Sequence, residues 1–186
     1  ENTEIWAPSP IPDVGSDVQP KEMTIPEIRQ MVQKFVDGAR FAKIAKCDGV
    51  EVHGAHGFLI NEFMSPRTNK RMDLYGGSFE KRMRFPLEII KGIKEVCGED
   101  YPISFRLSAD EFIGENGNTL ADGKKIAKVL EDAGVHVIHV SSGIYESITT
   151  LLEPQGYQEG WRLYLAEEIK TVSYTHLRAH ETPEHL

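Results

Sequence analysis

Two histidines, three residues apart, stand where a short apolar segment gives way to a glycine-rich loop. They are His53 and His56, in the run Gly49-Val-Glu-Val-His-Gly-Ala-His-Gly57. Imidazole groups donate hydrogen bonds, transfer protons and bind metals, so the pair is a candidate for chemistry at the end of a strand. A catalytic zinc site uses three protein ligands, and no third ligand occurs at a suitable spacing. We expect no metal here; two packing histidines are the alternative.

A second candidate is Arg106, which interrupts the apolar segment formed by Ile103, Phe105 and Leu107. A cation near the end of an apolar strand is costly unless it is paired. We therefore expect a buried partner for Arg106. The alternative is an arginine whose aliphatic stem is buried while its guanidinium reaches solvent.

Helices and strands must position these side chains, and the apolar periodicity predicts that the two alternate. Thr24 and Glu27 form a capping box that starts a helix ending near Lys46. The other expected helices cover residues 78–98 and 119–133, and the expected strands cover residues 50–53, 102–107 and 135–140. Residues 1–23 are rich in proline, so no regular element is expected there.

This alternation predicts βαβ units in a parallel sheet. A doubly wound sheet and a (β/α)₈ barrel both fit the pattern. A polar or glycine-rich segment follows every expected strand, and loading one end of the strands in this way favours the barrel. Doubly wound folds also bind ligands at strand ends.

The composition excludes several classes of function. The chain has 186 residues and a formal net charge of -8, which argues against a nucleic-acid partner because backbone binding needs surplus cations. No apolar run approaches the roughly 20 residues of a membrane span, and no signal segment opens the sequence. Cys47 and Cys97 form no motif, so we expect a protein of the reducing cytoplasm.

Several motifs in order resemble the old yellow enzyme family, which comprises flavin-dependent ene-reductases and includes the 2,4-dienoyl-CoA reductases. The motifs are the histidine run, Thr68-Asn-Lys-Arg-Met-Asp-Leu-Tyr-Gly-Gly-Ser78, Phe105-Arg-Leu-Ser108 and Val140-Ser-Ser-Gly143. The resemblance extends from about Ala7 to Lys170. It implies an FMN-binding (β/α)₈ TIM barrel, of which this chain supplies about strands 4 to 6, helices 3 to 5 and part of helix 6.

The resemblance also implies roles for single residues. His53 and His56 would hold the carbonyl oxygen of an unsaturated carbonyl or enoyl-type substrate, where negative charge develops during hydride transfer. Phe58 would line the same substrate site. Arg106 would lie against the flavin's N1 and C2 carbonyl, where a cation stabilises the anionic ring, and Ser141 would approach the flavin. NAD(P)H is the implied reductant.

Phe58 departs from the family pattern. Many members have a tyrosine at this position, which resembles a proton donor to the substrate's α-carbon, and phenylalanine has no O–H group. The proton must then come from water or another side chain, or the electrons pass to another acceptor. Tyr145 is a candidate donor by position only, and an exposed loop aromatic is the alternative.

The motif from Asn69 to Ser78 is a structural block in the family. Asn69, Arg71 and Asp73 would hold the long loop after the first expected strand. The glycines before Ser78 also fit a phosphate loop at a helix start, but the structural interpretation is favoured.

The segment Val172-Ser-Tyr-Thr-His-Leu-Arg-Ala-His-Glu-Thr182 resembles a translated sequencing-library adaptor. We therefore predict a partial barrel domain over residues 1–171 and a non-native tail over residues 172–186; a histidine-rich metal-binding tail is the alternative.

The expected protein is an FMN-dependent, NAD(P)H-consuming oxidoreductase. We expect a small-molecule substrate as its partner, and no nucleic-acid or membrane partner. Assembly into a homo-oligomer is left open. Any iron–sulfur cluster of the parent would lie outside this segment. Because the family's flavin-phosphate loops have no counterpart here, we expect the fragment to be incompetent alone. The alternative is a non-catalytic truncated barrel that associates through its open sheet.

Overall fold

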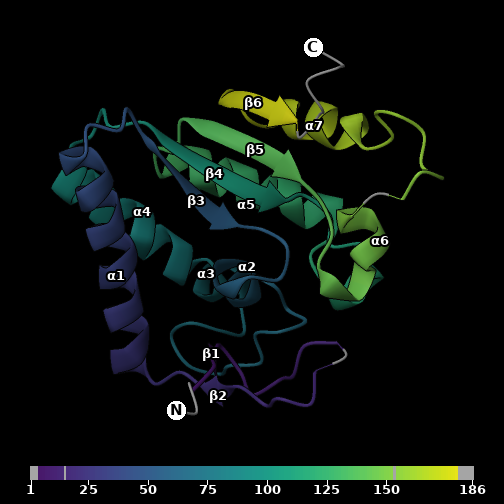
Figure 1. Cartoon of the computed structure of the whole chain (residues 1–186), viewed down its shortest axis with the longest axis horizontal. Helices are drawn as coiled ribbons and strands as arrows, with labels where there is room; N and C mark the ends of the chain where they lie inside the picture. The colour runs from purple at the N-terminus through teal and green to yellow at the C-terminus, as the bar shows by residue number, and fades with distance from the viewer. Residues whose placement is uncertain (1–3, 15, 153, 180–186) are drawn as a thin grey trace.

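The centre of the molecule is a parallel four-stranded sheet, seen in a computed structural model that describes residues 4–14, 16–152 and 154–179 (Figure 1). The strands follow in the order β3 (Val50–Gly54), β4 (Ile103–Ser108), β5 (Val137–Ser141) and β6 (His176–Ala179). All three pairings between neighbours are parallel. The carboxyl ends of the strands therefore meet at one end of the sheet.

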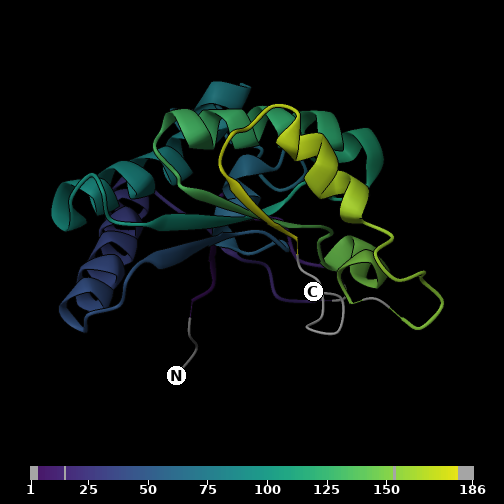
Figure 2. The same cartoon turned by 90° about the horizontal axis from the view of Figure 1, so that it is seen from above.

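Helices form the connections between these strands. The helices are α1 (Ile25–Ile44) before β3, α2 (Leu59–Met64), α3 (Phe79–Arg82) and α4 (Arg84–Cys97) before β4, α5 (Leu120–Asp132) before β5, and α6 (Ile148–Leu151) and α7 (Leu163–Lys170) before β6. Two single 3₁₀ turns, η1 (Gly114–Asn116) and η2 (Tyr145–Ser147), lie in the loops after β4 and β5. Figure 2 shows α5 and α7 lying over one face of the sheet.

The two faces of the sheet differ in chemistry because side chains alternate along a strand. On β4, Ile103, Phe105 and Leu107 are fully buried in the main core with α4 and α5, whereas Ser104 and Arg106 point to the opposite face. The polar face extends onto the neighbouring strands, because His53 on β3 and His139 on β5 are the cross-strand neighbours of Arg106. The sheet therefore presents one apolar and one polar face.

The predicted strands and two of the three predicted helices are confirmed to within two residues. The capping box at the start of α1 is also confirmed: the Thr24 N–H donates to the Glu27 carboxylate (2.7 Å), and the Glu27 N–H donates to the Thr24 hydroxyl (3.4 Å). The helix expected over residues 78–98 is divided at Met83 into α3 and α4. Pro86 has no N–H to donate to the Arg82 carbonyl, which interrupts the helical pattern at this place.

Several short elements were not expected. Residues 1–23, expected to be irregular, contain β1 (Trp6–Ala7), which pairs in parallel with β2 (Lys21–Glu22). The short helix α2 lies inside the long loop after β3. The strand β6 pairs with β5 and falls in the segment that we excluded as non-native.

The block from Asn69 to Ser78 has the structural role that its resemblance implied. Asn69 Nδ2 donates to the carbonyls of Phe63 and Tyr75, each at 2.7 Å. The Arg71 guanidinium donates to the carbonyls of Pro8 (2.9 Å) and Met23 (2.7 Å). A Cβ on Gly76 would lie 2.5 Å from Arg71 Cβ, so this close packing requires glycine.

Candidate active site

Polar residues from three consecutive strands gather at the carboxyl end of the sheet. His53 lies near the end of β3, Arg106 and Ser108 on β4, and Ser141 at the end of β5. The loop after β3 returns over this end and brings His56 to Ser141. In parallel α/β folds, ligands bind at this end of the strands.

His53 is held in one tautomer by the backbone. The Ala55 N–H donates to His53 Nδ1 at 3.3 Å, so in the neutral ring the proton is on Nε2. Burial, together with the positive charge of Arg106, lowers the pKa of His53 below its usual value. At neutral pH the ring is therefore neutral and carries an Nε2–H that can donate to a bound oxygen.

His56 is more rigidly held than His53. The residue is 6% exposed and has the left-handed φ of 65°, which is unfavourable for a residue with a Cβ. Its N–H donates to Ser108 Oγ (3.0 Å), and its Nε2 lies 2.6 Å from Ser141 Oγ. The two histidine rings are edge to face with centroids 5.2 Å apart. The structure thus brings Ser141, at the end of β5, to the pair His53 and His56 that follows β3 in the sequence.

An aromatic pair lies on the loop side of His53, with Phe58 next to the His53 ring and Tyr145 next to Phe58. The Phe58 ring is 4.9 Å from the His53 ring and is 48% exposed. The Tyr145 ring lies 6.2 Å from Phe58 and is 44% exposed. Phe58 therefore borders the histidine pair, and Tyr145 lies one ring further away.

Within the described ranges of the chain, the Nε of Arg106 does not meet the hydrogen-bonded partner that the sequence led us to expect. Its Nε is buried and has no hydrogen-bond partner among the described residues, and burial lowers its pKa. Glu51, whose negative charge acts on Arg106, accepts from Ser104 Oγ (2.8 Å) and pairs with His139 Nδ1 (3.1 Å). A buried donor without an acceptor suits a bound group that supplies an acceptor atom.

Three polar residues on or near the polar face of the sheet were missed. Ser108 could have been found, because the alternation on β4 puts it on the same face as Arg106. Glu51 could have been found by the same alternation on β3. Glu111 is fully buried in the loop after β4 and had no signal, since a single glutamate in a polar loop is ordinarily exposed.

Among the described residues, no group of three or more His, Cys, Asp or Glu side chains could hold a metal ion. Within the same residues, no helix has the length and apolar character needed to cross a membrane.

Relatives of known structure share this arrangement of strands and helices. A 2-naphthoyl-CoA reductase complex matches 95% of this chain with a TM-score of 0.87 and 34% identity, over 27% of its own chain. Morphinone reductase matches 95% with a TM-score of 0.76 and 26% identity, over 49% of its chain. These relatives are barrel enzymes, which confirms the expected partial (β/α)₈ barrel.

The sequence comparisons agree with the structural ones. An NADH oxidase of Thermoanaerobacter brockii is 68% identical over 166 residues, covering 89% of this chain and 25% of that protein. An NADPH dehydrogenase of Geobacillus sp. (strain WCH70) is 47% identical over 83% of this chain and 44% of its own length. The chain thus spans between a quarter and a half of these relatives. The NADH:flavin oxidoreductase / NADH oxidase family matches residues 4–178, and the chain belongs to this family.

Proposed function

We propose that this chain is part of an FMN-dependent oxidoreductase that uses NAD(P)H in the cytoplasm to reduce the activated C=C bond of an unsaturated carbonyl or enoyl-type substrate. The family and the relatives named NADH oxidase and NADPH dehydrogenase support the flavin and nicotinamide chemistry. The observation that carries the proposal is the pair of donors on adjacent strands: the neutral His53 ring and the buried, unpartnered Nε of Arg106.

Arg106 and Ser141 are the residues proposed to hold the cofactor. The flavin ring, when bound, supplies the hydride and accepts negative charge at its N1 and C2 carbonyl edge. Arg106 fits this group because its orphaned Nε–H needs an acceptor and its positive charge would stabilise that edge. Ser141 presents a hydroxyl at the end of β5, already within hydrogen-bond distance of His56.

His53 and His56 are proposed to bind the substrate's carbonyl oxygen, with Phe58 beside them. Donors placed at a developing oxyanion lower the barrier by about 3–4 kcal/mol each in well-studied cases. His53 is the stronger donor of the two, because Nε2 of His56 already lies 2.6 Å from Ser141 Oγ. Phe58 cannot deliver a proton, so Tyr145 or water is proposed to do so.

Steady-state turnover of NAD(P)H with an enone, by the full-length protein that contains this segment, tests the proposal. We expect kcat/KM to fall about 100-fold or more in His53→Ala and by a smaller factor in His56→Ala. The control is Tyr101→Phe, which removes a hydrogen bond at the opposite end of the sheet. Unchanged kcat/KM in both histidine variants would overturn the oxyanion role.

For the chain alone, we propose that it does not retain FMN and that it associates. A groove of about 400 Å³ lies between α1 and the outer edge of β3, lined by apolar residues that include Met31, Phe35 and Ile93. Exposed strand edges and apolar grooves favour association. Size-exclusion chromatography with flavin absorbance tests this: a monomer with stoichiometric bound FMN would contradict it.

We also propose that residues 172–186 are non-native. The support is the adaptor-like sequence from Val172 to Thr182. The family match, by comparison, continues to residue 178. Sequencing the gene across the codon of Val172 tests the proposal, and an uninterrupted genomic reading frame through Leu186 would contradict it.

A further inference from the structure

A fully buried carboxylate, Glu111, lies in the loop after β4 and has no part in the proposed chemistry. Its Oε1 accepts from Asn61 Nδ2 (2.9 Å) and Asn118 Nδ2 (3.2 Å). Its Oε2 accepts from Ser65 Oγ (2.8 Å) and the Asn118 N–H (2.9 Å). An ionised carboxylate only accepts hydrogen bonds, so these four donors match the charged form of Glu111 and oppose the effect of burial, which raises the pKa of this carboxyl.

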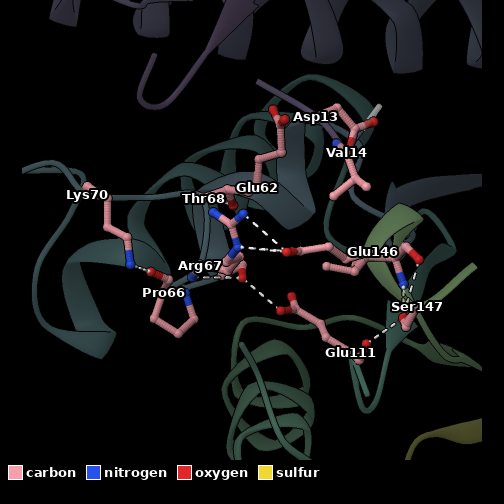
Figure 3. Close-up of polar contacts among 12 residues, drawn as sticks. Asp13, Val14, Glu62, Pro66, Arg67, Thr68, Lys70, Glu111, Glu146 and Ser147 are labelled. Carbon is pink, nitrogen blue, oxygen red and sulfur yellow. Dashed lines mark hydrogen bonds and ion pairs between the residues drawn. The ribbon is translucent and has the colours of Figure 1, made fainter. Parts of the chain in front are cut away.

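The donors come from different loops, so Glu111 joins segments that are distant in sequence. Asn61 and Ser65 follow β3, whereas Asn118 follows β4. The Ser147 hydroxyl, which follows β5, donates to the Glu111 carbonyl at 2.6 Å (Figure 3). The loops after three consecutive strands therefore meet at Glu111.

An ion pair also joins two of these loops nearer the surface. Figure 3 shows Arg67, from the segment after β3, directed at Glu146, from the segment after β5, with Nε and Oε2 2.9 Å apart. The two side chains are 29% and 30% exposed. An ion pair this accessible to water contributes little to the stability of the fold. The buried carboxylate of Glu111 therefore makes the stronger connection between these loops.

The link from Glu111 to the histidines passes through Asn61. Because Asn61 Nδ2 donates to Glu111, its Oδ1 faces the other way and accepts from the Gly57 N–H at 2.7 Å. His56 and Gly57 are both left-handed, with φ values of 65° and 78°. Such a conformation at His56 persists only when its surroundings hold it.

We propose that Glu111 is a positioning residue for the histidine loop: by fixing the Asn61 amide it holds the Gly57 N–H, and so keeps the left-handed turn that places His56 against Ser141. The catalytic value of this turn rests on the proposed function. The structural part of the proposal does not, because it concerns only contacts within this chain.

The Glu111→Gln variant of the full-length protein that contains this segment tests the proposal, because it keeps the shape of the side chain but replaces one acceptor with an NH₂ group. If the Asn61 amide turns to accept from that group, its own NH₂ meets the Gly57 N–H and the hydrogen bond to Gly57 is lost. We expect hydrogen exchange at Gly57 to become about tenfold faster, with a shift of the His56 ring signals in NMR. Exchange at Phe105, in the middle of β4, should stay the same.

Tyr101→Phe is the matched control, because it removes the hydrogen bond from Tyr101 to the Cys47 carbonyl and should leave Gly57 exchange unchanged. Asn61→Ala is the second variant and should accelerate Gly57 exchange as much as Glu111→Gln does. The double variant should add little, since both changes act on one link.

Equal acceleration at Gly57 and Phe105 in Glu111→Gln, or no acceleration at Gly57, would overturn the positioning role. If Glu111→Gln does not fold by circular dichroism, Asn61→Ala decides in the same way. Accelerated Gly57 exchange in a protein whose turnover is insensitive to His53→Ala would instead overturn the proposed function and leave the positioning role standing.

Discussion

Arg71 and Arg106 both have buried guanidinium nitrogen atoms, but the two side chains differ in their hydrogen-bond partners. The Arg71 side chain is 3% exposed and its donors are used by two backbone carbonyls and the Asp73 carboxylate. Arg106 has a buried Nε with no acceptor in the described part of the chain. Since an unused buried donor costs free energy, the comparison indicates that Arg71 serves the fold, and it supports the proposal that Arg106 serves a ligand.

Replacing Arg71 with methionine should have the largest effect on stability. The variant leaves the carbonyls of Pro8 and Met23 without their donor and Asp73 without its cation. We expect the free energy of unfolding in urea to fall by about 2–4 kcal/mol. Arg40→Met, which breaks a surface pair with Asp37, should change it by less than about 0.5 kcal/mol. Equal losses in the two variants would remove the structural role of Arg71.

Two carboxylates, Asp73 and Glu62, also differ in their surroundings. The difference should have an intermediate effect on stability, and this effect depends on pH. Hydrogen bonds from Arg71 keep the pKa of Asp73 below its usual value, whereas burial, with the charge of Asp13, raises the pKa of Glu62 to about 7. The folded chain therefore binds a proton at Glu62 more tightly than the unfolded chain, and the free energy of unfolding should fall as pH rises from 4.5 to 7.

Unfolding experiments at pH 5 and pH 7.5 measure this loss, which we expect to be about 1–3 kcal/mol for the unchanged chain. Glu62→Gln cannot ionise and should flatten the profile. A variant with the same pH dependence as the unchanged chain would show that Glu62 has an ordinary pKa.

Replacing Arg106 with methionine should have the smallest effect, and the opposite sign. The variant removes a half-buried cation whose Nε has no acceptor in the described structure. We expect the free energy of unfolding to stay constant or to rise by up to about 1 kcal/mol at pH 7. A loss of more than about 2 kcal/mol would mean that Arg106 holds the fold together as Arg71 does.

The sequence predicted what depends on local patterns. The alternation of Ile103, Phe105 and Leu107 identified β4, and the pair Thr24 and Glu27 located the start of α1. The location of the site at the carboxyl end of the sheet followed from the rule that parallel strands end together. These features need only neighbours along the chain, so the residue types are sufficient.

Contacts between distant segments were not predictable in this way. Glu111 meets Asn61 and Ser65, which lie 50 and 46 residues earlier. Among the residues that the structure describes, the buried partner expected for Arg106 does not form a hydrogen bond with its Nε, because Glu51 accepts from Ser104 and pairs with His139 on neighbouring strands. Such pairings depend on register and loop packing, which periodicity does not encode.

FMN binding by the full-length protein that contains this segment tests the central claim most directly, since it asks whether the unused donor of Arg106 belongs to a ligand. Equilibrium titration of the apoprotein, followed by flavin fluorescence, gives the Kd for the unchanged protein and for Arg106→Met. Loss of a charged hydrogen bond worth about 1.5–3 kcal/mol predicts a Kd about 10- to 100-fold higher. An equal Kd in a folded Arg106→Met variant would contradict the account.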